Sequence, residues 1–135
     1  MARRVLDTNV LINFWRDSVG DRRLRAITRV DSRKWGRKLL DLHDGDAVTV
    51  TPVIIEFLCG VQSSHELTLA QAFLSSFKIA DEGEIPPKDW EESQRLAQRV
   101  PRDGKARQLG DCLIRAICNR LKLEVLTGER RFVRP

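Results

Sequence analysis

Short apolar segments rich in β-branched residues alternate with helical stretches along the chain, and this order constrains the fold more than any other feature. Strands are predicted at residues 5–6, 47–51, 78–80 and 124–127. Between them apolar residues recur at helical spacing, most regularly over residues 111–121. Strands that alternate with helices form parallel sheets through right-handed crossovers. The sequence therefore predicts an α/β fold in which a central parallel sheet of four to five short strands carries helices on both faces.

Helix caps and prolines place the helices between these strands. Thr8 and Asn9 are both good N-caps for the first helix, and Pro52 suits the first turn of the helix after the second strand. Pro101 is expected to end the helix predicted over residues 89–100. The remaining helices are predicted over residues 34–43, 66–77, 89–100 and 111–121. No repeat or linker divides the 135 residues, so we expect a single domain over residues 1–135.

Composition excludes several classes of protein. No apolar run is long enough to span a bilayer, and the N-terminus lacks the shape of a secretory signal. The three cysteines (Cys59, Cys112 and Cys118) have no metal-ligand spacing, and only two histidines are present. We therefore expect a cytoplasmic protein with reduced thiols and no zinc site, and we expect no role for a thiol in catalysis.

Positive charge is concentrated in one segment. The net charge is +5, but residues 16–38 alone hold nine basic against three acidic residues. Such asymmetry suits a polyanionic partner, and it equally suits helix faces that are simply solvated. If the partner is a nucleic acid, the candidate contacts in this segment are Arg22, Arg23, Arg25 and Lys34. The tryptophans at positions 15, 35 and 90 do not alternate with a basic run, so we expect them to pack in the fold.

Four acidic residues fall at strand exits or helix starts. Asp7 follows the first strand, Glu56 lies early in the next helix, Asp111 begins a helix, and Glu129 comes two residues after the last strand. Each acid alone suits a helix cap or a solvated side chain. Together they would meet at one sheet edge, where two carboxylates about 5 Å apart repel by about 3 kcal/mol. Oxygen ligands without histidine or cysteine select hard cations such as Mg²⁺ or Mn²⁺.

Four sequence motifs resemble those of the PIN-domain nucleases, with spacings usual for VapC-type toxins. The four segments are residues 5–12 (VLDTNVLI), 51–61 (TPVIIEFLCGV), 109–114 (LGDCLI) and 125–132 (VLTGERRF). They occur in the family's order and cover essentially the whole chain. Each motif alone is weak, while the four together are fairly specific.

The resemblance implies a PIN-like fold and metal-dependent endonucleolytic cleavage of RNA, with Mg²⁺ or Mn²⁺ as the cofactor. By position, Asp7, Glu56 and Asp111 would be the central metal ligands, and Glu129 the fourth acid. Asn9 and Thr127 match polar positions that support such a site. For a VapC-type toxin the resemblance further implies a cognate antitoxin protein as partner and a homodimer as the free form.

The chain departs from the family's pattern at three places. Arg131 stands where the family often has aspartate, and Arg115 replaces a residue that is usually small and apolar. Arg115 follows Asp111 by one helical turn, so it is expected either to pair with that carboxylate or to contact a phosphate. The chain also ends soon after Phe132, where relatives often continue into a final strand. The number of metal ions stays open.

Two other functions compete with the nuclease. One is a catalytically inactive PIN-like module that binds RNA or a protein; the acids at all four positions favour the enzyme instead. The other is a protein-interaction module whose basic segment, residues 16–38, binds an acidic peptide. The last function predicts binding that survives the loss of the acidic residues.

Overall fold

A computed structural model describes residues 3–99 and 108–127 of the chain. Its sheet consists of four strands, β1 Arg4–Leu6, β2 Ala47–Thr49, β3 Lys78–Ile79 and β4 Glu124–Leu126. All neighbouring pairs are parallel, in the order β3-β2-β1-β4. In the centre of the sheet Val5 lies between Val48 of β2 and Val125 of β4. The predicted parallel α/β fold is confirmed.

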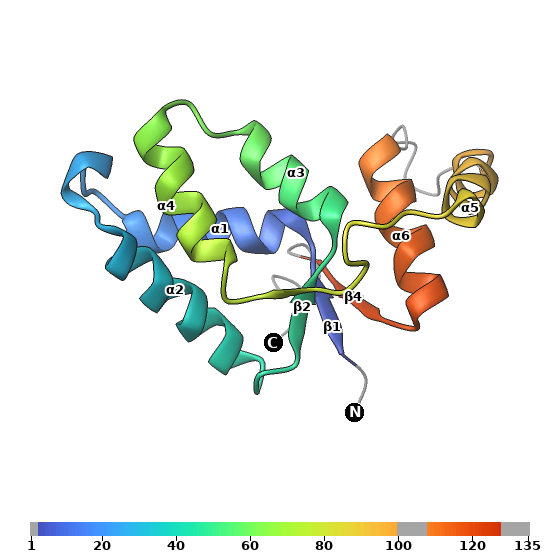
Figure 1. The fold of residues 1–135 in the computed structure, drawn as a ribbon, viewed down its shortest axis with the longest axis horizontal. Coiled ribbons are helices and arrows are strands. Elements are labelled where there is room, and N and C mark those ends of the chain that lie inside the picture. The colour runs from blue at the N-terminus through green and yellow to red at the C-terminus, as the bar shows by residue number, and fades with distance from the viewer. Residues whose placement is uncertain (1–2, 100–107, 128–135) are drawn as a thin grey trace.

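Helices cover both faces of this sheet (Figure 1). They are α1 Thr8–Val19, the short 3₁₀ helix η1 Leu24–Ala26, α2 Arg29–Leu42, α3 Thr51–Cys59, α4 Ser64–Leu74, α5 Pro87–Ala97 and α6 Leu109–Leu121. In Figure 1 α1, α2 and α4 lie on one side of the strands, and α5 and α6 lie on the other. Helix α3 contacts both α1 and α6, so it links the two layers beyond the strand ends. Among the helices of the described residues, none combines the length and the apolar composition that a membrane crossing needs.

The start of α1 differs from the expected one. Asp7, and not Thr8 or Asn9, is the N-cap, because its carboxylate accepts the backbone N–H of Thr8 at 2.8 Å. The prediction that Thr8 or Asn9 caps this helix is therefore wrong. The first strand ends at Leu6, as predicted, and the helix begins directly after Asp7 without an intervening turn.

Capping also extends two other helices beyond their expected starts. Thr28 and Asp31 form a capping box, in which each side chain accepts a backbone N–H of the other residue, so α2 begins at Arg29 and not at residue 34. The Thr28 N–H lowers the pKa of the Asp31 carboxyl. Ser63 caps α4 through the N–H of Glu66. At the other end of a helix, α5 stops at Ala97, before the predicted Pro101 boundary, which lies outside the described residues.

Aromatic rings cluster in the core on the α1, α2 and α4 side of the sheet. Phe73 of α4 is fully buried, and its ring lies 5.3 Å from Trp15 and 5.7 Å from Phe57. Trp35 packs edge-on against Trp15 at 5.6 Å. The packing expected for Trp15 and Trp35 is therefore confirmed. Trp90 is 44% exposed on α5, so that expectation is wrong for Trp90.

Candidate functional site

The carboxyl edge of the parallel sheet gathers the segments that carry the predicted acids. Asp7 follows β1 directly, and its N–H donates to the carbonyl of Leu126 at the end of β4 at 2.9 Å. Glu56 lies in the second turn of α3, the helix that follows β2. Asp111 lies in the first turn of α6. Parallel strands present their carboxyl ends at one edge, where α/β proteins bind their ligands.

Glu56 connects the other two acid-bearing segments. Its Oε1 accepts the Thr8 hydroxyl at 2.5 Å, across a separation of 48 residues. Its Oε2 lies so close to the start of α6 that a Cβ placed on Gly110 would stand 2.2 Å away. The carboxylate of Glu56 therefore lies between the residue that follows Asp7 and the residue that precedes Asp111. Thr8 and Gly110 were not predicted as site residues, although both belong to the motifs.

Asp111 is paired with a cation from its own helix. The Arg115 Nε lies 3.3 Å from Asp111 Oδ2, and the two side chains are 49% and 45% exposed. This is the pairing that the i, i+4 spacing predicts. An ion pair this exposed contributes at most about 1 kcal/mol, so the guanidinium can leave the carboxylate at little cost.

The donor groups suit a hard cation in kind. They are carboxylates, and Gly110 leaves the space that the Glu56 carboxylate occupies. With the side chains as they stand, residues 3–99 and 108–127 contain no group of three acids, histidines or cysteines that could hold a metal ion. Asp7 caps α1 and Asp111 pairs with Arg115, so both carboxylates would have to turn toward a shared cation.

The remaining predicted site residues lie in different parts of the fold or outside the described residues. Asn9 is exposed in the first turn of α1, and Thr127 directly follows β4. Glu129 and Arg131 lie outside the described residues. The assignment of Asp7, Glu56, Asp111 and Glu129 as metal ligands, with Asn9 and Thr127 in support, stays a prediction.

Of the predicted RNA contacts, Arg22 has an internal role. Its guanidinium donates to the carbonyl of Ser18 at 2.7 Å and lies 5.0 Å from the ring centroid of Trp35. Arg23 and Arg25 are exposed around η1, and Lys34 is exposed on α2. These RNA contacts stay predictions.

A buried carboxylate that the sequence reasoning missed fixes the start of α3. Asp81 lies two residues after β3, at the same edge of the sheet, and is 6% exposed. Its Oδ1 accepts the N–H of Thr51 at 3.0 Å, while Oδ2 is buried without a hydrogen-bond partner in the described part of the chain. Val50 offers α3 no side-chain cap, so Asp81 provides one from 30 residues away. Asp81 thereby helps to hold the helix that carries Glu56.

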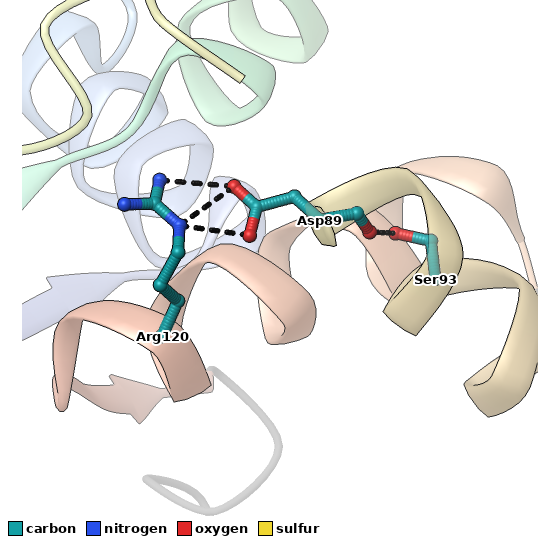
Figure 2. Close-up of polar contacts among 3 residues, drawn as sticks. All are labelled: Asp89, Ser93 and Arg120. Carbon is teal, nitrogen blue, oxygen red and sulfur yellow. Dashed lines mark hydrogen bonds and ion pairs between the residues drawn. The ribbon is translucent and has the colours of Figure 1, made fainter. Parts of the chain in front are cut away.

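A second missed carboxylate joins α5 to α6, as Figure 2 shows. Asp89 is 1% exposed, and its two oxygens accept from Arg120 Nε and Nη2 at 2.9 to 3.1 Å. This hydrogen bonding raises the pKa of Arg120. The Ser93 hydroxyl donates to the backbone carbonyl of Asp89 at 2.7 Å. The pair holds α5 against α6, the helix that presents Asp111 and Arg115.

The cysteines take no part in this arrangement. Cys112 and Cys118 are buried and Cys59 is exposed, all as free thiols. Burial raises the pKa of the Cys118 thiol to about 12. A thiol with so high a pKa is a poor nucleophile at neutral pH. For Cys59 and Cys112 the absence of thiol catalysis stays a prediction.

Comparison with known proteins identifies one family. The sequence model of the PIN domain matches residues 4–135, a span that includes all four motif segments. No curated protein matches the chain. PIN domains are typically metal-dependent nucleases.

Proposed function

The chain belongs to the PIN domain family, and we propose that it is a divalent-metal-dependent endoribonuclease, a VapC-like toxin neutralised by a cognate antitoxin. The observation that carries the proposal is the position of Glu56. Its carboxylate contacts Thr8, the neighbour of Asp7, and lies against Gly110, the neighbour of Asp111. Three acids from distant parts of the sequence therefore come to one edge of the sheet, as a site for a hard cation requires.

Each of these residues has a definable part in the proposed reaction. Asp7, Glu56, Asp111 and Glu129 would hold Mg²⁺ or Mn²⁺, which when bound lowers the pKa of its water ligand and polarises the phosphodiester. The Thr8 hydroxyl fixes one oxygen of Glu56 and leaves the other directed toward α6.

The two helix starts provide the rest of the electrostatics. The N-terminus of α1 stabilises the negative charge of its cap, Asp7. Arg115 neutralises Asp111 while no cation is present, and its weak, exposed pairing lets it turn to a phosphate oxygen of the substrate.

The proposal includes the partners that a VapC-like toxin requires: RNA as substrate, an antitoxin protein that blocks the site, and a second copy of the chain in a homodimer. We also propose a cytoplasmic location. The alternative is an inactive PIN-like module that binds RNA or a protein without cutting. The acids present at residues 7, 56 and 111 favour the enzyme.

Cleavage of a structured RNA by the purified protein, with Mn²⁺, with Mg²⁺ and with EDTA, tests the proposal. Asp7→Asn and Asp111→Asn should each lower the cleavage rate by at least about 100-fold, because each removes a charged ligand. Asparagine is also a good N-cap, so Asp7→Asn should leave the fold stable. Asp17→Asn, an exposed position on the same helix α1, is the matched control and should cut normally. If the folded, partner-free protein cuts under no condition, the inactive module replaces the enzyme.

A further inference from the structure

An open groove of about 710 Å³ runs along α2 beside the end of α4. Four basic side chains of α2 and two hydroxyls just after α4 line most of it: Arg33, Lys34, Arg37, Lys38, Ser75 and Ser76. We call this feature the α2 groove. Asp7, Glu56 and Asp111 do not belong to its lining.

Close packing of the two helices places the hydroxyls opposite the basic residues. Gly36 is buried, and a Cβ there would lie 2.3 Å from the Phe73 carbonyl oxygen of α4 and 2.9 Å from Ser76 Oγ. Only glycine permits this approach of α2 to α4. The basic residues next to Gly36 are thereby brought beside Ser75 and Ser76, which form the other wall of the groove.

The positive charge of the α2 groove is only partly offset by neighbouring acids. The four basic residues are exposed, and no ion pair found among residues 3–99 and 108–127 includes any of them. Among the described residues, Asp41 is the one acid in the lining. A groove of this charge attracts polyanions.

We propose that the α2 groove binds the sugar–phosphate backbone of the RNA at a distance from the cleaved bond. This inference rests on the proposed function, which makes RNA the substrate. The basic residues repeat at i and i+4, a rise of about 6 Å along the helix axis, which is roughly the length of one nucleotide in a strand. Arginine, lysine and serine are the side chains that commonly contact phosphate oxygens.

The position of the α2 groove predicts a dependence on RNA length. Helix α2 leads to the start of β2 (Figure 1), whereas Asp7 follows the end of β1 and Glu56 lies on α3 after the end of β2. Only an RNA long enough to pass around the domain can contact both places. The groove should therefore contribute more to the binding of long RNA than to that of short RNA, and the cleavage of short RNA should not depend on it.

The test compares the full chain with a groove variant and a control of equal charge. The groove variant is Arg33→Gln, Lys34→Gln, Arg37→Gln and Lys38→Gln. The control variant replaces four exposed basic residues outside the groove and outside the basic segment: Arg3→Gln, Lys78→Gln, Lys88→Gln and Lys122→Gln. Fluorescence anisotropy in EDTA measures binding of a uridine RNA of about 40 nucleotides and one of about six, over a range of salt concentrations. Circular dichroism verifies that all the proteins are folded.

The groove variant should bind the long RNA at least about tenfold more weakly than the control variant does. The slope of log affinity against log salt concentration should be smaller by about three, because each of the four lost phosphate contacts contributes about 0.7. Binding of the short RNA, which can occupy the groove or the acidic edge but not both, should fall by a smaller factor. With Mn²⁺, the KM for the long RNA should rise while cleavage of the short RNA stays at the wild-type rate.

Equal affinity and equal salt slope in the groove and control variants would overturn the inference. If the groove variant keeps its RNA affinity but loses affinity for a poly-glutamate peptide, the occupant of the groove is an acidic protein and not RNA. Because binding is measured in EDTA, the result does not depend on catalysis. If the wild-type protein never cuts RNA but its RNA binding depends on the groove, the proposed nuclease activity is refuted and the proposed RNA-binding groove stands.

Discussion

Replacing Gly110 by alanine should separate stability from activity. Gly110 is the second residue of α6 and has an ordinary helical φ, so its backbone accepts alanine. Alanine in place of glycine in a helix contributes up to about 1 kcal/mol of stability. The new Cβ would, however, lie 2.2 Å from Glu56 Oε2, where ordinary contacts begin at 3.4 Å. The flexible end of Glu56 must therefore move by roughly 1 Å, a displacement that can cost a catalytic group about 100-fold in rate.

We expect Gly110→Ala to unfold at the wild-type temperature or slightly above it, because only a side-chain end has to move. We expect kcat/KM for RNA cleavage with Mn²⁺ to fall about 100-fold, which corresponds to about 2.7 kcal/mol of transition-state stabilisation. Mn²⁺ affinity, measured by electron paramagnetic resonance of the free ion, should fall as well. Thermal unfolding measures the expected stability, and the cleavage assay measures the expected loss of kcat/KM.

Gly60→Ala is the matched control. Gly60 follows α3, and a Cβ there would meet only the Phe57 carbonyl oxygen, at an ordinary 3.7 Å. This variant should keep both stability and cleavage. Wild-type cleavage by Gly110→Ala would refute the place given to Glu56 in the site. A loss of several kcal/mol of stability would show that the alanine meets rigid structure and not a flexible carboxylate.

Two further predictions concern buried groups. Arg120→Met should destabilise the fold by about 3–5 kcal/mol in urea unfolding, because it leaves Asp89, whose side chain is 2% exposed, without its cation. Asp89→Asn should cost only about 1–2 kcal/mol, because Arg120 is 33% exposed and reaches water. A larger loss of stability in Asp89→Asn than in Arg120→Met would contradict this account. Burial raises the pKa of the Cys118 thiol from 9.0 to about 12, so between these pH values the unfolded chain loses the proton while the folded chain keeps it. The free energy of unfolding should therefore fall as pH rises from 9 to 12, by up to about 1.4 kcal/mol per pH unit. Cys118→Ala should remove that part of the slope, and iodoacetamide at pH 9 should label Cys59 much faster than Cys118; equal labelling would show that Cys118 is not buried.

Much of the fold could be predicted because its signals are local in the chain. Alternating strands and helices predict a parallel sheet, and the four strands lie within a few residues of their expected positions. The acids could be assigned to one edge for the same reason. Parallel strands share a carboxyl end, so a residue that follows a strand belongs to that edge whatever the details of packing. The pairing of Arg115 with Asp111 was also predictable, since helical spacing alone makes them neighbours.

Helix starts were predicted less well because capping depends on which polar side chain meets which N–H. Thr28 and Asp31 have the spacing of a capping box, a local signal that the sequence reasoning passed over. The cap of α3 is of another kind. Asp81 comes from 30 residues further along the chain, and nothing near Thr51 in the sequence indicates it.

The sequence by itself determined the fold class, the family and the edge at which the acids gather, because periodicity, strand order and motif spacing are properties of neighbouring residues. Only the tertiary structure decided how that edge is held. The contacts of Glu56 with Thr8 and Gly110, and the burial of Asp89 against Arg120, join residues from different helices. Such contacts depend on where helices cross and how closely they approach, which follows from the packing of the whole core and not from any one segment.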